Sequence, residues 1–171
     1  MTPLPAALLA GAERSGAELM AWRLDRVDRA ADWSSGEGAR LYGGRWNAVG
    51  QRAVYLSLDP STTILEKAVH GGFSMLDRVP HVMTGVVIED PAAVRVMVPA
   101  EIPKSAWLRP GTLNAAQQAF GGQLLVAHAF LVIPSVVSSL SWNLVFDPAR
   151  AQGKCVLKQQ KPFELDRRLR E

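Results

Sequence analysis

The chain has 171 residues, of which 48% are hydrophobic and 20% are charged, values that fit one folded domain with a buried core. The formal net charge of +3 is spread along the chain, which suits anionic small molecules and permits nucleic acid without requiring it. No apolar stretch approaches the length of a transmembrane helix, so we expect no membrane-spanning segment.

The N-terminal third predicts an appended segment, one strand and a loop. Residues 1–20 are rich in Ala, Leu and Gly and match an N-terminal extension, so we place a single domain over residues 21–171. The run 20–24 predicts the first strand, and the polar, glycine-punctuated stretch after it predicts a long loop with a helical turn.

Two helices are expected. Asp59 is a suitable N-cap, Pro60 suits the first helical position, and Gly71-Gly72 should end that helix. Residues 112–128 predict a second helix that Gly121-Gly122 should interrupt.

Short runs rich in β-branched and aromatic residues predict the remaining strands. They cover residues 52–58, 81–90, 93–99, 129–135, both ends of 136–148, and 154–165. Because strands and helices do not alternate regularly, the pattern favours an α+β fold, with a mixed, largely antiparallel β core and a few flanking helices.

Cysteine and histidine usage narrows the chemistry. The single cysteine, Cys155, cannot form an internal disulfide and is expected to be a buried thiol. The three histidines are far apart, so we expect no metal site. The first apolar run lacks the preceding basic residue of a signal peptide, and we expect a cytoplasmic protein.

The usual nucleotide and hydrolase motifs are missing from the sequence. Neither the P-loop pattern nor a strand-following G-x-G-x-x-G occurs, and there is no G-x-S-x-G elbow. Any nucleotide must therefore be bound by another geometry.

Two arginines have both a functional and an ordinary interpretation. Arg23 follows Trp22 in an apolar strand, where it is either an edge residue reaching water or an anion clamp inside a cleft. Arg45 follows Gly43-Gly44 and precedes Trp46, and it is either a surface cation stacked on the tryptophan or a fork for phosphate.

Four further side chains are equally open when taken alone. Tyr55 is a packing residue or a platform for a flat ring, and Glu66 belongs to a solvated helix face or is a catalytic carboxylate. Ser135 and Asn143 are turn or backbone-capping residues, or they belong to a site.

The order of these residues resembles one known family. Residues 35–70, "SGEGARLYGGRWNAVGQRAVYLSLDPSTTILEKAVH", are similar to the central motif of the RES-domain family, the toxin halves of RES–Xre toxin–antitoxin modules. The family is named for an arginine, a glutamate and a serine. The similarity continues in "WR" at 22–23, "IPSVV" at 133–137, "WNLVFDP" at 142–148 and "FELDRRL" at 163–169.

The resemblance implies a fold similar to ADP-ribosyltransferase toxin domains, with NAD⁺ as the substrate and no metal. Arg23 and Arg45 would hold the pyrophosphate and ribose side, and Tyr55 would stack on the nicotinamide. Glu66 would stabilise the positive charge that develops as the glycosidic bond opens, and Ser135 would complete the pocket. Asn47 and Asn143 would either contact the ligand themselves or support residues that contact it.

The resemblance also implies partners and leaves the reaction open. An Xre-like helix-turn-helix antitoxin would cover the active site in a hetero-oligomer, and DNA binding would belong to that partner. Water, phosphate or a protein side chain could accept the ADP-ribose. A nucleic-acid-directed toxin is the alternative that the basic composition suggests. At residues 147–150 the chain departs from the family pattern. Family members often have Asn-Pro-x-His at these positions, and this chain has "DPAR".

Overall fold

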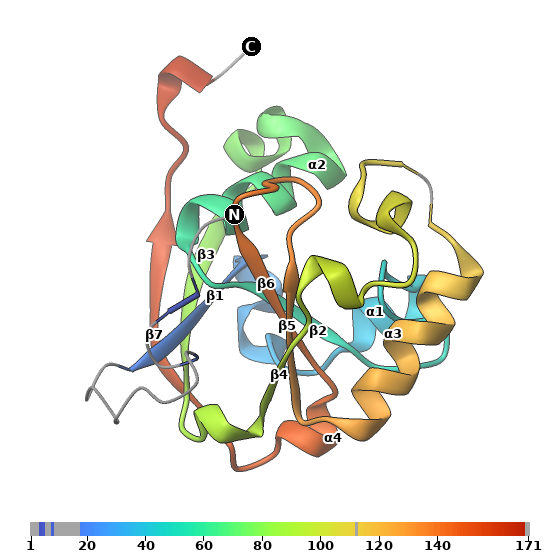
Figure 1. Cartoon of the computed structure of the whole chain (residues 1–171). Coiled ribbons are helices and arrows are strands. Elements are labelled where there is room, and N and C mark those ends of the chain that lie inside the picture. Colours follow the sequence, from blue (N-terminus) through green and yellow to red (C-terminus); the bar gives the residue numbers. More distant parts are fainter. Residues whose placement is uncertain (1–3, 6–7, 9–17, 112, 170–171) are drawn as a thin grey trace.

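The computed structural model describes residues 4–5, 8, 18–111 and 113–169, and their fold is built on one seven-stranded sheet (Figure 1). The strand order is β4-β5-β6-β2-β1-β3-β7, and every neighbouring pair is antiparallel except β4 and β5. The strands are β1 (Leu19–Arg26), β2 (Val54–Ser57), β3 (His81–Ile88), β4 (Val94–Val96), β5 (Phe130–Pro134), β6 (Trp142–Phe146) and β7 (Cys155–Phe163). The expected α+β class with a largely antiparallel core is confirmed.

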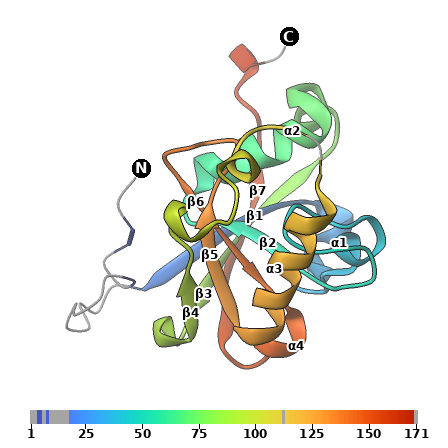
Figure 2. The ribbon, with the colours of Figure 1, turned by 45° about the vertical axis from the view of Figure 1, so that its right-hand side comes forward.

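The helices flank this sheet without alternating with its strands. The α-helices are α1 (Glu37–Tyr42), α2 (Pro60–Arg78), α3 (Ala115–Ala127) and α4 (Pro148–Ala151). Short 3₁₀ helices are η2 (Val27–Asp32), η3 (Pro91–Ala93), η4 (Pro99–Glu101), η5 (Ser105–Leu108) and η6 (Arg167–Leu169). Figures 1 and 2 place α1 and α3 close together on one side, while α2 crosses one end of the sheet.

The strand β5 shows why the central run is apolar at every position. Phe130 and Val132 pack into one core cluster, whereas Leu131 and Ile133 pack into the cluster below α3 on the other face. Successive side chains of a strand point to opposite faces, so a strand covered on both sides needs apolar residues throughout.

Of two predicted strands, one is shorter than expected and the other does not form. The expected strand over 93–99 is only β4, because Pro99 begins the 3₁₀ helix η4. The strand expected directly after Ser135 is wrong, because Ser135 Oγ accepts a hydrogen bond from the backbone N–H of Ser138 at 2.9 Å. A serine that bonds to the backbone in this way favours a turn over a strand.

The expected start of α2 is confirmed and its expected end is wrong. Asp59 accepts a hydrogen bond from the Thr62 N–H at 2.7 Å, and Pro60 is the first helical residue. Gly72, with φ 74° and ψ 165°, makes a kink, and the chain then resumes a helix that ends at Arg78. This second part contributes Leu76 to a core cluster, so burial favours continuing the helix beyond the glycines.

The expected interruption of α3 at Gly121-Gly122 is also wrong, since the helix is continuous from Ala115 to Ala127. A Cβ at Gly121 would lie 2.4 Å from the backbone oxygen and 2.7 Å from the Cα of Trp46. The glycine therefore permits close approach of α3 to the loop that carries Trp46.

We predict that Gly121→Ala destabilises the protein by about 1–3 kcal/mol, because the new methyl group meets backbone that cannot rotate away. Gly38→Ala in α1 is the matched control, since a Cβ there meets no atom within 4 Å. The control should be neutral or stabilising by up to about 1 kcal/mol. Denaturant unfolding measures both, and equal free energies of unfolding for the two variants would contradict the packing argument.

The C-terminal strand β7 forms one edge of the sheet and is largely exposed. Its pairing with β3 contains a register shift at Gly85/Val86. Cys155 begins this strand and is half-buried, so the expectation of a buried thiol is wrong. Burial, followed by the charge of Glu89, raises the pKa of the Cys155 thiol.

His81 is a buried titratable group at the start of β3, with 1% of its surface exposed. Its Nδ1 lies 2.5 Å from the carbonyl oxygen of Val79 and must donate to it. Nε2 has no hydrogen-bond partner among the described residues, so a proton there would be buried without an acceptor. Burial accordingly lowers the pKa of His81 below its ordinary value of 6.5.

We predict that the free energy of unfolding falls as the pH drops through about 6.5, because the unfolded chain then binds a proton that folded His81 resists. His81→Asn keeps an N–H donor but does not titrate, and it should flatten this dependence. His70→Asn, at an exposed position, should keep the parent's dependence. Urea unfolding between pH 5 and 8 measures the effect, and an unchanged slope in His81→Asn would refute it.

Candidate active site

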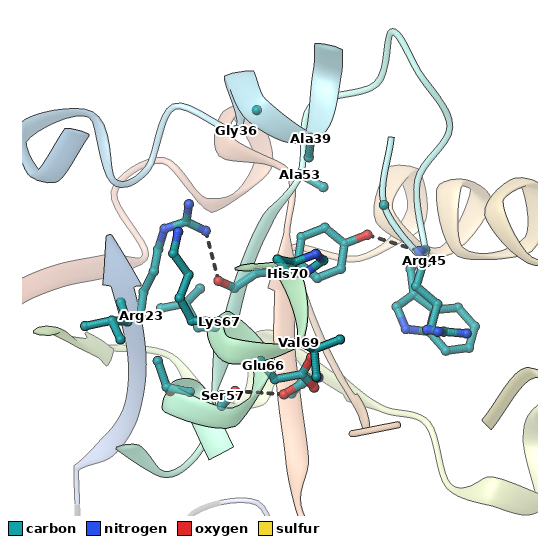
Figure 3. A pocket seen from close by; sticks show the side chains of 18 of the residues that line it. Arg23, Gly36, Ala39, Arg45, Ala53, Ser57, Glu66, Lys67, Val69 and His70 are labelled. Carbon is teal, nitrogen blue, oxygen red and sulfur yellow. Dashed lines mark hydrogen bonds between the residues drawn. The ribbon is translucent and has the colours of Figure 1, made fainter. Parts of the chain in front are cut away.

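A cavity of about 590 Å³ opens between α1, α2 and the sheet (Figure 3). Its walls come from β1, the turn after α1, β2, α2 and β6. Five of the predicted site residues line it, and they are Arg23, Arg45, Tyr55, Glu66 and Asn143. The volume is in the range of small-molecule sites.

Glu66 on α2 is held by one side chain that directly follows β5 and by one from β6. Its Oε1 accepts a hydrogen bond from Ser135 Oγ at 2.8 Å and another from Asn143 Nδ2 at 2.5 Å. Ser57 Oγ donates to Asn143 Oδ1 at 2.8 Å, which fixes the amide with its NH₂ group toward Glu66. Within the described residues Oε2 receives no hydrogen bond, so one carboxylate oxygen remains available to a ligand.

Ser135 therefore acts from behind the carboxylate. It is buried and does not line the cavity, although the neighbouring Pro134 and Val136 do. Its hydroxyl accepts the Ser138 N–H and donates to Glu66, so both roles of the oxygen are used. The structure thus joins the predicted serine to Glu66 by a hydrogen bond, and both predicted arginines line the same cavity as Glu66.

Arg23 points into the cavity from β1. Its Nε donates to Asp25 Oδ2 at 2.7 Å, and Nη1 donates to the backbone oxygen of Tyr55 at 3.0 Å. β1 lies between β2 and β3, so the interpretation of Arg23 as an edge residue is wrong. Two fixed contacts leave the remaining guanidinium edge oriented for an anion.

Arg45 approaches from the other side of the cavity (Figure 3). It is half-buried, and Nη2 lies 3.4 Å from the backbone oxygen of Gly111. The next residue, Trp46, is 3% exposed and belongs to the core below α3. The buried indole therefore anchors the turn that presents Arg45, and a surface tryptophan–arginine stack is excluded.

Tyr55 and Asn47 hold that turn in place. The Tyr55 hydroxyl donates to Asn47 Oδ1 at 2.7 Å and accepts the Trp46 N–H at 3.0 Å. A Cβ at Gly44 would lie 2.5 Å from the Tyr55 hydroxyl oxygen, so glycine is required there by packing. Burial raises the pKa of Tyr55, which keeps the phenol neutral while its ring forms part of the cavity wall.

Asn47 is fully buried, and its Nδ2 donates to the backbone oxygens of Ala39, Ala48 and Gln51. It does not line the cavity, so its position gives no support to a direct ligand contact. Its amide instead joins α1 to the following turn. Asn143 differs, because it lines the cavity and contacts Glu66.

Tyr55→Phe should destabilise the protein by about 1–3 kcal/mol, because Asn47 Oδ1 and the Trp46 N–H lose their buried partner. Tyr42→Phe is a matched control, since Tyr42 is 80% exposed and the chain has only these two tyrosines. The control should change stability by less than about 0.5 kcal/mol. Thermal and denaturant unfolding test the pair, and equal stabilities would argue against the hydroxyl contacts.

Sequence reasoning missed several residues of the cavity wall, among them Ser57, Lys67 and His70. Ser57 was detectable, because it follows Tyr55 by two positions in one strand and shares its face. At the rim, Glu37 pairs with Arg40 and Arg52, and the Arg40 hydrogen bond lowers the pKa of Glu37. His70 carried a comparable signal, because it follows Glu66 by four positions on one helix face, whereas Lys67 carried none.

Two further properties concern the described part of the chain. It contains no group of three or more His, Cys, Asp or Glu side chains placed to hold a metal ion. None of its helices is both long enough and apolar enough to cross a membrane.

The segment 147–150, where the chain departs from the family pattern, has a local role. Asp147 caps α4 by accepting a hydrogen bond from the Ala149 N–H at 2.8 Å.

The fold is an α+β domain with a mixed sheet, and its described cavity is lined by two arginines and by a glutamate that a buried serine contacts. The sequence profile of the RES domain matches residues 20–166, and the chain belongs to the RES domain family. The expected family membership is thereby confirmed.

Curated relatives and a solved structure agree with this membership. The chain is 31% identical over 141 residues to a "Prs ADP-ribosylating toxin" from Sphingobium sp., covering 78% of this chain and 84% of the relative. It is 28% identical over 131 residues to a "Toxin Res" from Photorhabdus laumondii, covering 76% and 82%. The M. tuberculosis MbcT–MbcA toxin–antitoxin complex contains a similar chain, with a TM-score of 0.68, 20% identity, and coverage of 86% and 85%. At that identity the structural similarity concerns the fold.

Proposed function

We propose that this chain is a toxin that consumes NAD⁺ by breaking the bond between nicotinamide and ribose. The observation that carries the proposal is Glu66, held by Ser135 and Asn143 in a cavity that two arginines also line. Relatives named as toxins, one of them ADP-ribosylating, support the same conclusion.

The chemistry requires stabilisation of a positive charge. As the C–N bond breaks, its electron pair leaves with nicotinamide and the ribose carbon acquires oxocarbenium character. The Glu66 carboxylate, oriented through Oε1, is suited to stabilise that charge. Arg23 and Arg45 would hold the pyrophosphate and ribose side and so position the reacting carbon, while the Tyr55 ring would lie against nicotinamide.

The acceptor of the ADP-ribose defines the second candidate. Attack by water, which releases one proton to the solvent, makes the chain a glycohydrolase, and attack by an unprotonated phosphate oxygen makes it a phosphorylase. Attack by a protein side chain makes it a mono-ADP-ribosyltransferase, which the name of the Sphingobium relative favours. The nucleic-acid alternative has less support, because the cavity is lined by the carboxylates of Glu37 and Glu66, which repel phosphate groups.

A protein partner follows from the same proposal. The similar chain of M. tuberculosis occurs in a toxin–antitoxin complex. We propose that an Xre-like helix-turn-helix antitoxin covers this cavity in a hetero-oligomer, and that DNA binding belongs to the antitoxin. The chain would then inhibit growth from the cytoplasm once the partner is lost.

Glu66→Gln should reduce nicotinamide release from NAD⁺ at least about 100-fold, because the amide keeps the shape of the side chain but removes its negative charge. Nicotinamide is measured with the antitoxin-free chain, with and without phosphate and with cell lysate. Mass spectrometry of the products separates free ADP-ribose, phosphorylated ADP-ribose and modified protein.

Glu89→Gln is the control, because Glu89 is exposed and lies outside the cavity. It should retain nicotinamide release and growth inhibition. A parent chain that releases no nicotinamide under any of these conditions would refute the proposed activity. Full activity in folded Glu66→Gln would refute the assignment of the carboxylate.

A further inference from the structure

Lys67 lines the cavity, but the proposed reaction assigns it no role. It follows Glu66 directly on α2, it is half-buried, and it lines the same cavity. Figure 3 shows its side chain beside that of Arg23. Within the described residues its ammonium has no hydrogen bond and no ion pair, although a lysine placed in a cavity wall loses much of its hydration.

The charges around Lys67 leave it uncompensated. Arg23 and Asp25 form an ion pair at 2.7 Å, so these two charges balance each other. Arg26 is likewise paired with Asp28 at 3.0 Å. Lys67 forms no ion pair of its own with any described residue, and the one carboxylate whose charge favours its ammonium, Asp25, is already paired with Arg23.

The environment of the ammonium agrees with a missing anion. Burial lowers the pKa of Lys67; among the neighbouring charges Asp25 raises it, and Arg23 and Arg26 lower it. An anion bound between Lys67 and Arg23 would neutralise this excess and would accept hydrogen bonds from both groups.

We propose that Lys67 and Arg23 together form a phosphate-binding subsite at the β1–α2 end of the cavity, across from Arg45. Arg23 supplies a fixed guanidinium and Lys67 supplies the net charge. The phosphate is either the diphosphate of the dinucleotide or inorganic phosphate. This inference rests on the proposed function, and it makes Lys67 a binding residue next to the catalytic carboxylate.

Binding measurements on the full chain test the subsite separately from turnover. Calorimetry with ADP-ribose and with inorganic phosphate, each as a separate probe, uses the Glu66→Gln chain so that no reaction intervenes. Adding Lys67→Met should weaken one probe about 10–100-fold, as expected for loss of a hydrogen-bonded charge. Adding Lys67→Arg should restore the affinity to within a few-fold, and Lys154→Met, at an exposed position, should leave it unchanged.

The two probes distinguish the sources of phosphate. A loss with ADP-ribose alone assigns the subsite to the dinucleotide, and a loss with inorganic phosphate assigns it to that anion. Unchanged affinity for both in Lys67→Met, or no binding of either probe by the Glu66→Gln chain, overturns the subsite. If binding depends on Lys67 while the parent releases no nicotinamide, the proposed activity fails and the subsite stands.

The pH dependence gives a readout that a purely structural lysine would not change. The titratable groups facing Lys67 are Arg23, Asp25 and Arg26 of β1 and His81 of β3. Burial lowers the pKa of Lys67, so its ammonium loses its charge at a lower pH than an exposed lysine does. Affinity for the responsive probe should therefore fall as the pH rises through the lowered pKa of Lys67, and Lys67→Arg should abolish the fall. An equal fall in both chains overturns the role of Lys67, and this comparison holds even if Lys67→Met fails to fold.

Discussion

Glu66 Oε1 accepts hydrogen bonds from Ser135 and Asn143, and these two bonds connect α2 to the ends of β5 and β6. Ser135 is buried beside the last residues of β5, and Asn143 is oriented by Ser57 of β2. The carboxylate is thus held directly from the end of β5 and from β6, and through Asn143 from β2, so its position depends on the register of these strands. Changes far from the cavity that shift this register would move the carboxylate as well.

A second set of contacts holds the wall of the cavity on which Arg45 lies. Tyr55 and Asn47 fix the turn of Gly44, and the buried Trp46 packs against Gly121 of α3. Gly44 of this turn serves the packing of protein on protein, because a Cβ there would meet the Tyr55 hydroxyl. Arg45 is consequently presented by a turn that is rigid before any ligand binds, which reduces the entropy lost on binding.

Local signals were sufficient for some elements and insufficient for others. Asp59 and Pro60 determine the start of α2 within a few residues, so the sequence alone could reveal it. The continuity of α3 depends on Trp46, which is distant in sequence from Gly121. The hydrogen bonds that Ser135 and Asn143 donate to Glu66 join residues 69 and 77 positions apart, and no periodic pattern in the sequence could predict such contacts. The family resemblance, and not the pattern of residues, pointed to this site, and it gave no indication of Lys67.

The exposed edge strand β7 has a consequence for how this chain meets other proteins. Lys158 and Lys161 place charge along the edge, Pro162 has no N–H to offer, and the register shift with β3 disturbs the ladder. Such an edge is a poor template for adding another strand, so self-association into extended sheets is disfavoured. Any protein that contacts this edge would therefore meet charged and polar side chains before it meets free backbone groups.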